Sequence, residues 1–534
     1  MGKISLYYNT VKNMKRSQII NRLKIKLGKG CSLGVTPASG FENIQLVNSP
    51  EILDFDPVFL ARFPVSELME NRVTILHSSK TVDWQTTWVF DDKSALWNFN
   101  LHYFEYLFPL IKAWKDTEDK EYLDKTIEII NGWIDSNSIG KAPGWASYPT
   151  ALRIVNWISW YGYVSNSLDE EFRDKFLLSL HTQFAYLIKR LEKDILGNHY
   201  FEDLKSLVIA SIFFKDDAVL QKALIGFKSE CKEEILDDGM HFELSPMYHK
   251  IIFEGLLRTV VALNGSGRKD LELESYVQPM LDVAFSFEEG LERIPLFNDC
   301  GNNVAKSLDA LVRTSAKLGF NPVFKSQMNS SGFYIFHKKI DGNYWKLIVD
   351  AGQPGPQYIP GHAHCDAMSF ELFCNGKPVI VNCGTYAYQC DERNFFRSTE
   401  AHNTVMIYGT EQSQCWGTFR LAKRSSTKVL DVSDSTITME MIDQRGHRIQ
   451  RHIKITDYFF VSDKSEGYCL VSYIHNLGNM SAVSTKALSE ESRSFYAADY
   501  GVKNEIPTLK LISENQIEFN IDLKSLVTEI GVIA

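Results

Sequence analysis

The hydrophobic pattern of this sequence changes its period once, near residue 320, and this change constrains the fold more than any other feature. From about residue 94 to residue 318, apolar residues recur at the spacing of amphipathic helices. Short polar or glycine-bearing stretches separate the segments, so neighbouring helices are expected to form antiparallel hairpins. The predicted helices cover residues 94–116, 120–137, 149–166, 170–194, 201–215, 217–238, 246–265, 274–290 and 304–319.

After Gly319 the segments become short, rich in β-branched and aromatic residues, and separated by turn-forming pairs such as Asn-Gly and Ser-Asp. This pattern predicts antiparallel strands. The predicted strands cover residues 331–339, 343–352, 367–376, 377–384, 403–409, 426–434, 435–443, 447–456 and 458–466. A run of helices followed by a run of strands indicates separate domains and not an alternating parallel α/β fold.

The chain has 534 residues, which is too long for a single compact core. We therefore predict three parts: an irregular, partly helical extension over residues 1–90 that packs on the helical domain, an all-helical domain over 91–325, and an antiparallel β-sandwich over 326–534.

The charge and the cysteines exclude several classes of protein. A net charge of −9 argues against a broad basic surface for nucleic acid, although a local basic cleft for an acidic substrate stays compatible with it. No apolar run is long enough for a transmembrane segment. The nine cysteines are scattered without a CxxC pair, which favours free thiols in a reducing compartment over a disulfide framework or a zinc ribbon.

The first thirty residues are basic and contain no uninterrupted apolar core of a signal peptide, so we expect a cytoplasmic protein. A basic amphipathic start can touch a membrane surface. The more ordinary alternative is a helix that packs on its own domain.

The segment GNHYFEDLKSL places a histidine at the start of a predicted helix. A separation of three puts His199 and Glu202 on one helix face, where the carboxylate can orient the imidazole and hold it charged. The alternative is an ordinary helix N-terminus with Asn198 as its cap and acidic residues favoured by the helix dipole.

The segment DDGMHFELSPMYHKIIFEG places a tyrosine in the first turn of the helix that follows Ser245 and Pro246. Near the positive end of the helix dipole and beside His249, Tyr248 can have a lowered pKa and exchange protons. The alternative is a tyrosine that packs its ring and bonds its hydroxyl to the backbone.

The segment PGHAHCDAMSFELFCNGKPVIVNCG carries two histidines separated by two positions. In an extended segment His362 and His364 point to the same side, and Asp366, Asn382 and His402 follow along the chain. Such a set is compatible with zinc or a similar ion, but an HxH pair also arises by chance. By contrast, no GxSxG, GxxxxGK[ST] or strand-flanked GxGxxG occurs, which argues against a serine hydrolase and a nucleotide-binding loop.

Several segments, in this order, resemble the heparinase II/III-like family of polysaccharide lyases over nearly the whole chain. They are ALWNFNLHYFEYL, SYPTALRIVNWISW, NHYFEDL and ELSPMYHK in the helical half, then GHAHCDAMSFEL, VNCGTYAY and FRSTEAHNTV in the β half. The resemblance implies an incomplete (α/α) toroid followed by an antiparallel β-sandwich, with an acidic polysaccharide bound in the cleft between them.

The resemblance also implies roles for particular residues. His199 matches the toroid histidine that neutralises the substrate carboxylate, Tyr248 the catalytic tyrosine, and His362 the sandwich histidine that faces it. The further substrate contacts implied are Asn198, Glu202, Arg153 and Arg397.

His364, Asn382 and His402 fall where related enzymes place a structural zinc. The family usually has aspartate at the position of Asn382, and a neutral amide is a weaker ligand than a carboxylate. This departure puts the zinc site in doubt.

The implied reaction is β-elimination of a 4-linked uronic acid. Donors such as His199 and Asn198 would stabilise the enolate-like charge that develops when the C5 proton leaves. Either Tyr248 or His362 would take that proton, and Tyr248 would protonate the leaving O4. No water attacks, so the carboxylate pair of a glycosidase is not required.

Two alternatives stay open. A toroid glycoside hydrolase would need two convergent carboxylates, for which Glu202, Asp203 and Glu243 are candidates. A non-catalytic glycan-binding or assembly protein on the same fold is favoured by the Asn382 departure. The expected cytoplasmic location suggests a role in making or trimming a bacterial surface polysaccharide such as capsule or O-antigen.

Overall fold

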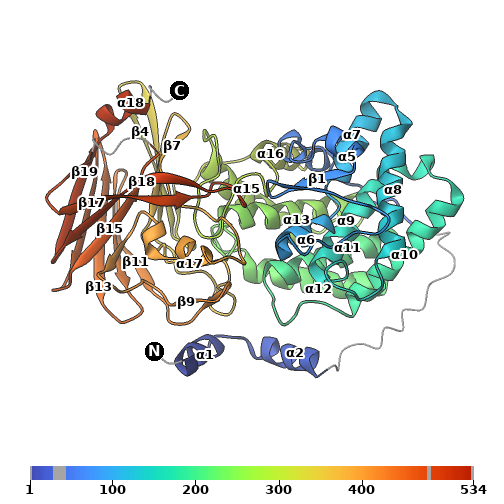
Figure 1. Ribbon diagram of the computed structural model, residues 1–534, viewed down its shortest axis with the longest axis horizontal. Coiled ribbons are helices and arrows are strands. Elements are labelled where there is room, and N and C mark those ends of the chain that lie inside the picture. The colour runs from blue at the N-terminus through green and yellow to red at the C-terminus, as the bar shows by residue number, and fades with distance from the viewer. Residues whose placement is uncertain (1–2, 28–43, 478–482, 531–534) are drawn as a thin grey trace.

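The computed structural model describes residues 3–27, 44–477 and 483–530, in which a helical half and a β half lie side by side (Figure 1). The last helix of the helical half, α16 (Leu308–Lys317), ends shortly before the first strand of the β half, β3 (Gln327–Met328). The change of period near residue 320 therefore coincides with the change from helices to sheets. None of the helices in the described ranges combines the length and the apolar composition that a membrane crossing needs.

Each segment predicted to be helical contains helix, and the first of them contains two. The helices are α6 (Ala95–Leu101), α7 (Leu107–Thr117), α8 (Lys120–Ser136), α9 (Ser147–Val164), α10 (Glu170–Ile188), α11 (Asn198–Phe214), α12 (Asp217–Glu234), α13 (Pro246–Gly265), α14 (Leu271–Ser275), α15 (Val277–Glu288) and α16. The break between α6 and α7 contains Phe104, which has a positive φ of 67° and a fully buried ring. Its ring packs against Trp88, Trp133 and Trp157, and this tertiary packing overrides the helical period.

The toroid surrounds α11, which packs against α9, α12 and α13. Every residue from 201 to 213 of α11 is buried. The second half of the helix, residues 207–213, is almost entirely apolar, as expected for a helix packed on several sides, whereas its first turns carry polar residues toward the cleft.

The segments before α6 differ in where they pack. Residues 44–90 form the short helices α3 (Glu51–Asp54), α4 (Pro57–Leu60) and α5 (Val65–Met69) and the hairpin of β1 (Arg72–Ile75) and β2 (Ser78–Thr81), whose apolar side chains join the toroid core. In contrast, α1 (Lys3–Val11) and α2 (Arg16–Lys26) run beneath both halves of the molecule (Figure 1). The predicted extension therefore contacts the sandwich as well as the toroid.

In the described ranges, the β half contains three large antiparallel sheets and one two-stranded sheet. A five-stranded sheet has the order β3-β4-β5-β6-β7, a four-stranded sheet β17-β18-β15-β8, and a six-stranded sheet β11-β12-β13-β14-β19-β16. The strands after β3 are β4 (Phe333–Ile340), β5 (Asn343–Asp350), β6 (Phe370–Cys374), β7 (Lys377–Ile380), β8 (Val405–Ile407), β11 (Ser426–Val432), β12 (Thr436–Ile442), β13 (Arg448–Ile455), β14 (Tyr458–Ser465), β15 (Leu470–His475), β16 (Val483–Thr485), β17 (Leu488–Tyr496), β18 (Asn504–Ser513) and β19 (Gln516–Asp522).

Side chains from all three large sheets form one apolar core of the sandwich, including Leu347 of β5, Ile453 of β13 and Leu511 of β18. Every segment predicted as a strand contains one, whereas β15 to β19 lie beyond the last prediction. Smaller elements complete the half: β9 (Cys415–Trp416) pairs with β10 (Arg420–Leu421), α17 covers Arg393–Phe396, and α18 covers Leu523–Ile530. The eight cysteines in the described ranges are free, and Cys31 lies outside those ranges.

Candidate active site

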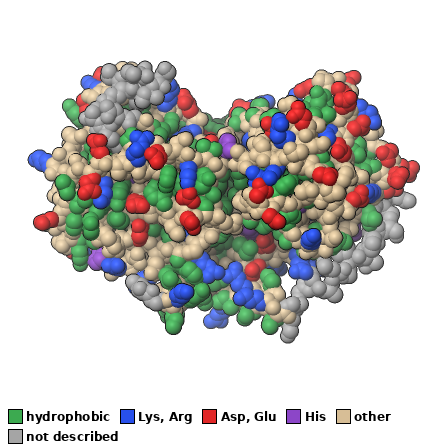
Figure 2. Space-filling model, in the orientation of Figure 1, with side chains coloured by type: hydrophobic (Ala, Val, Ile, Leu, Met, Phe, Trp, Pro, Cys, Tyr) green, Lys and Arg blue, Asp and Glu red, His purple; other side chains and the backbone are tan. Residues whose placement is uncertain are grey.

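A cleft of about 530 Å³ lies between the two halves, and the surface is hollowed there (Figure 2). Its lining comes from α9, α11 and α13 of the toroid and from the loops around residues 357–362 and 419–424 of the sandwich. Helices α1 and α2 contribute a further wall through Thr10, Met14, Gln18 and Arg22. Five of the predicted site residues line this cleft: Asn198, His199, Glu202, Tyr248 and His362.

His199 lies in the first turn of α11, directly after a glycine that the backbone requires. Gly197 caps the helix with a φ of 60° and a ψ of −147°, a conformation that only glycine adopts readily. A Cβ at this position would lie 2.8 Å from Oε1 of Glu243 and 3.0 Å from Cδ1 of Ile359. The glycine thus lets the start of α11 approach the segments that carry the other site residues.

The partner of His199 is Glu192, and the prediction that Glu202 holds this imidazole is wrong. Nδ1 of His199 lies 3.1 Å from Oε2 of Glu192, and its ring packs against that of Tyr148. Glu202 is buried one helical turn on and forms an ion pair with Lys205. Burial alone would lower the pKa of His199, but the charge of Glu192 and its hydrogen bond raise it above the ordinary value, which favours a cationic ring at the cleft wall.

Tyr248 lies in the first turn of α13, where Ser245 caps the helix by accepting the backbone N–H of Tyr248. Its hydroxyl lies 2.8 Å from that of Tyr388, which in turn lies 2.8 Å from that of Tyr500. The predicted lowering of the Tyr248 pKa is wrong: burial, together with the nearby Tyr388 and Asp299, raises this pKa well above its ordinary value. This raised pKa favours the protonated hydroxyl of Tyr248 in the resting protein.

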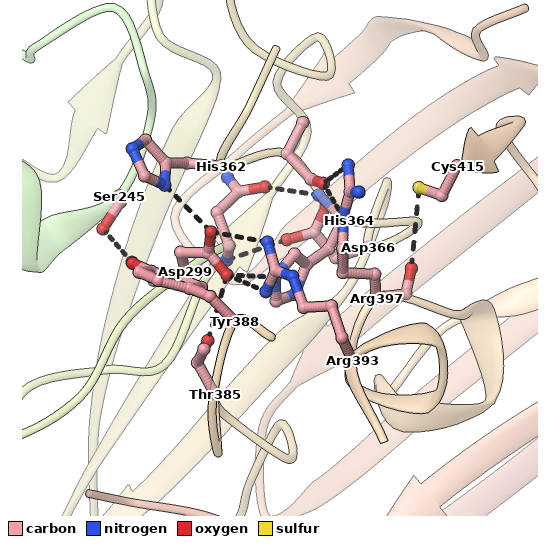
Figure 3. Close-up of polar contacts among 12 residues, drawn as sticks. Ser245, Asp299, His362, His364, Asp366, Thr385, Tyr388, Arg393, Arg397 and Cys415 are labelled. Atoms are coloured by element: carbon pink, nitrogen blue, oxygen red, sulfur yellow. Dashed lines mark hydrogen bonds and ion pairs between the residues drawn. The ribbon is translucent and has the colours of Figure 1, made fainter. Parts of the chain in front are cut away.

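His362 stacks on Tyr248, with the ring centroids 3.9 Å apart. Its Nδ1 donates to the carboxylate of Asp299 at 2.9 Å, which leaves Nε2 free to accept a proton (Figure 3). The carboxyl group of Glu243 lies 3.9 Å from this Nε2 and is buried; neither of its oxygens has a hydrogen-bond partner within the described part of the chain. Two carboxyl groups thus flank an imidazole that has one open nitrogen.

Asp299 holds the sandwich side of this site together, and the sequence motifs did not reveal it. Its carboxylate pairs with Arg393 and accepts from Nε2 of His364 at 2.9 Å and from Oγ1 of Thr385 at 3.3 Å (Figure 3). Burial alone would raise the pKa of Asp299, but Arg393 and the two histidine hydrogen bonds hold it well below its usual range. The segment FNDCG that contains it has no periodic or spacing signal, so only its position in space identifies it.

The residues predicted to bind zinc do not form a complete zinc site. Nδ1 of His364 lies 3.1 Å from Nε2 of His402, and the outer nitrogens of the two rings bond to Asp299 and to the carbonyl oxygen of Ser398. These two inner nitrogens could bind a cation, but Oδ1 of Asn382 accepts the backbone N–H of Asn403 instead. Within the described ranges no group of three or more His, Cys, Asp and Glu side chains is placed to hold a metal. A structural zinc takes four ligands, and His364, Asn382 and His402 do not provide such a set.

Two arginines predicted to contact substrate lie outside the cleft lining. Arg153 is fully buried in the toroid, where it stacks on Trp133 and bonds to Gln183 and to the carbonyl oxygen of His102. Arg397 is buried in the sandwich and donates to the carbonyl oxygen of Ala363, which directly follows His362. The predicted substrate contacts of Arg153 and Arg397 are therefore wrong. Both side chains stabilise the fold, and Arg397 supports the loop that carries His362.

Other cations do reach the cleft. Nη1 of Arg62 and both Nε and Nη1 of Arg424 are buried and have no hydrogen-bond partner among the residues described. Burial lowers the pKa of Arg424 to about 10, because no carboxylate offsets the loss of solvent. Arg424 donates from Nη2 to the carbonyl oxygen of Gln357, and Arg62 lies near Glu105 and Asp499. Their remaining buried N–H groups are costly without an acceptor, so both side chains are candidates for contacts to an acidic ligand.

Comparison with known proteins connects this geometry to one family. Residues 56–345, more than half of the chain, match the model described as heparinase II/III N-terminus, and residues 325–467 match heparinase II/III-like, C-terminal. The chain is 27% identical to a heparin-sulfate lyase of Pedobacter heparinus over 367 residues, which are 61% of this chain and 54% of that protein. It is 22% identical to a heparin-sulfate lyase of Bacteroides stercoris over 440 residues, 72% of this chain and 64% of that one. The matched regions span between half and two thirds of these relatives.

The fold is also found among solved structures. The crystal structure of heparinase III superposes with a TM-score of 0.68 at 14% identity, covering 95% of this chain and 92% of that one. A mutant of heparan sulfate lyase HepC from Pedobacter heparinus superposes with a TM-score of 0.57 at 17% identity, covering 92% and 85%. At such identities the similarity establishes the toroid-plus-sandwich fold alone.

Proposed function

The chain belongs to the heparinase II/III-like family of polysaccharide lyases, and from this premise we propose that it cleaves a uronic-acid-containing polysaccharide by β-elimination. One observation carries the proposal: the imidazole of His362, oriented by Asp299, stacks on Tyr248 inside a cleft whose other wall bears His199 and its partner Glu192.

His199 neutralises the substrate carboxylate in this proposal. The C5 proton of a uronic acid becomes more acidic when a cation or hydrogen-bond donor stabilises the enolate-like charge that forms on the carboxylate. A histidine held charged by Glu192 at the cleft wall supplies that cation, and Asn198, which also lines the cleft, is placed to add a neutral donor. Loss of a comparable donor in other enzymes costs about 3–4 kcal/mol of transition-state stabilisation.

His362 acts as the base and Tyr248 as the acid. Nε2 of His362 takes the C5 proton, the C5–H electron pair forms the C4=C5 double bond, and the C4–O4 bond breaks as the Tyr248 hydroxyl donates its proton to O4. Asp299 and Glu243 flank the imidazolium that forms and stabilise its charge. A tyrosine whose pKa is raised by burial is a poor base in the resting enzyme. For this reason His362 is the base and Tyr248 the acid in this proposal.

After O4 has left, the resting state returns when the His362 imidazolium gives up the proton taken from C5 and the Tyr248 phenolate regains one, by exchange with solvent in the open cleft. The hydroxyls of Tyr388 and Tyr500 form a chain of hydrogen bonds that ends at Tyr248, and both side chains line the cleft. This chain can donate to the developing phenolate and so lowers the cost of charge on a buried oxygen.

The glycoside-hydrolase alternative finds less support. Of the carboxylates that line the cleft, Glu202 pairs with Lys205, Glu254 with Arg258 and Asp194 with Arg22. The fourth, Glu105, lies near the charges of Arg62 and Lys306. Asp203 accepts the backbone N–H of Glu192, and Glu243 lies behind His362. A hydrolase needs one carboxyl group on each side of the scissile bond, and these contacts tie the candidates elsewhere.

The test is a panel of uronic-acid polysaccharides incubated with the protein, with product followed by the ultraviolet absorbance of the conjugated unsaturated uronate. Tyr248→Phe is the active-site variant, and Tyr458→Phe, which alters an exposed tyrosine of β14, is the matched control. Products without the unsaturated uronate would favour the hydrolase. Equal binding by wild type and Tyr248→Phe with no product from either would favour a glycan-binding or assembly protein. The setting in surface-polysaccharide metabolism and the cytoplasmic location stay predictions, which cell fractionation would test.

A further inference from the structure

The outward face of α1 and α2 is both apolar and basic. Between residues 3 and 27 the chain has seven lysines and arginines and no aspartate or glutamate, although the whole protein carries a net charge of −9. Among the exposed apolar side chains, Ile4, Tyr8 and Val11 on α1 recur at helical spacing, as do Ile20, Leu23 and Leu27 on and just after α2; Tyr7 and Ile25 are exposed beside them. The exposed basic side chains beside them are Lys3, Lys12, Arg16, Lys24 and Lys26.

The inward face of the same helices is occupied by the protein itself. Thr10 accepts a hydrogen bond from Nε1 of Trp416 at 3.0 Å, and Tyr7 packs edge-on against the same indole. On α2, Gln18 donates to the carbonyl oxygen of Ile195 at 3.0 Å, and Arg22 lies 3.7 Å from Asp194. These contacts fix α1 to the sandwich and α2 to the toroid, so packing on its own domains accounts for one face of this segment only.

The exposed face combines apolar and basic side chains and carries no acidic residue of its own helices. Figure 2 shows green and blue side chains along the lower edge of the molecule, where Figure 1 places α1 and α2. Ile4 is 86% exposed, and Tyr8 and Leu27 are each 68% exposed. Apolar side chains ringed by Lys and Arg are typical of helices that lie in the plane of a membrane interface, where apolar groups enter the acyl boundary and cations meet anionic headgroups.

We propose that the outward face of α1 and α2 docks on the surface of a bilayer that contains anionic lipid. Charge complementarity selects this occupant: a face with only positive charges attracts an anionic surface, and the apolar side chains between them give the interfacial contact that a soluble polyanion cannot provide. Because the inner side of the same helices lines the cleft through Thr10, Met14, Gln18 and Arg22, docking places the substrate cleft directly at the membrane surface.

The experiment is co-sedimentation of the full chain with phosphatidylcholine vesicles, with and without phosphatidylglycerol, at low and high salt. The expected result is binding to the anionic vesicles that weakens on adding salt, and little binding to the neutral ones. Lys24→Gln combined with Lys26→Gln should weaken binding about 30-fold at low salt, since each cation near an anionic surface contributes about 1 kcal/mol. Ile20→Ser combined with Leu23→Ser should weaken it at least about tenfold, because two apolar contacts are lost.

Matched controls exist on the outer surface of the toroid. Lys222→Gln with Lys232→Gln changes two exposed lysines of α12, and Ile225→Ser with Leu271→Ser changes two apolar side chains that are each 72% exposed. Both pairs should bind vesicles as the wild type does. None of the altered side chains lines the cleft, so lyase activity on a soluble polysaccharide should stay unchanged in every variant and reports separately on the proposed reaction.

Three results would overturn the proposal. The first is a wild type that does not sediment with anionic vesicles. The second is a pair of α2 variants that bind as the wild type does. The third is a dimer in sedimentation equilibrium that both α2 variants convert to monomer, because a second copy of the chain would then cover this face.

Discussion

Replacing Glu192 with glutamine should move the alkaline limb of the pH–activity profile to lower pH. Glu192 lies 3.1 Å from Nδ1 of His199, and the two side chains are only 17% and 33% exposed. The variant keeps the shape of the side chain and removes the charge that holds the His199 imidazole protonated. The backbone N–H of Glu192, which Asp203 accepts, stays in place.

The size of the shift follows from the geometry. Two unit charges about 4 Å apart attract with about 4 kcal/mol at the effective dielectric near a protein surface. Partial exposure of both groups screens this to about 1–2 kcal/mol. Losing this attraction favours the neutral imidazole, so the His199 pKa should fall in the variant. Burial also acts to lower this pKa, and the remaining carboxylates, Glu243 and Asp194, raise it less than Glu192 does.

The direction of the shift follows from the requirement for a protonated His199. A histidine whose pKa is raised keeps its charge until the pH rises through that raised value, so the wild type loses its cation at higher pH than the variant does. The variant should retain most of its kcat/KM on the acidic side of the profile and be about tenfold less active where only the wild type is still protonated.

The assay is initial lyase rate against pH for both proteins, with the His199 ring titrated by NMR. Asp194→Asn is a graded comparison, because Asp194 raises the His199 pKa less than Glu192 does and makes no hydrogen bond to the ring. An unchanged profile in Glu192→Gln, or a loss of rate that is equal at all pH values, would refute the assignment of His199 as the cation that neutralises the substrate.

Further expectations concern the acid, the anion contacts, the carboxylate behind the base and the metal. Tyr248→Phe should lower kcat by at least about 100-fold, as for loss of a general acid, whereas Tyr388→Phe should cost less because only the support of Tyr248 is lost; equal losses would contradict the order of the hydroxyl chain. Arg424→Gln should raise KM for acidic polymers about tenfold to 100-fold with little change in kcat, as a charged hydrogen bond of about 1.5–3 kcal/mol is removed; an unchanged KM would exclude this contact. Asp299→Asn should lower the free energy of unfolding by about 3–5 kcal/mol in urea titrations, because Arg393 keeps its buried charge without a partner; a stability equal to wild type would count against the ion pair. Elemental analysis after gel filtration should find zinc well below one ion per chain, and stoichiometric zinc would show that a ligand is supplied in a way these side chains do not indicate.

The three residues proposed for catalysis stood out in the sequence because their signals are local. Tyr248 follows a Ser-Pro helix start, His362 belongs to an HxH segment, and His199 opens a helix, so each is visible within a few residues of sequence. Their grouping in one cleft followed from the order of the motifs in a toroid-plus-sandwich fold.

The partners of those residues could not be predicted in the same way. Glu192 lies outside the helix that carries His199, and Asp299 reaches His362 across sixty-three positions of sequence. Spacing suggested Glu202 for the first role, yet the buried ion pair with Lys205 occupies that carboxylate instead.

By itself the sequence determined where helices give way to strands and which residue types the chemistry can use. The hydrophobic period, the turn residues and the helix caps each depend on a few neighbouring residues, so they can be identified from the sequence. Only the tertiary structure decided which side chains are charged, buried or paired. It raised the pKa of Tyr248, placed Arg153 in the toroid core and brought Asp299 to His362, because burial and electrostatics depend on atoms that are close in space and distant along the chain.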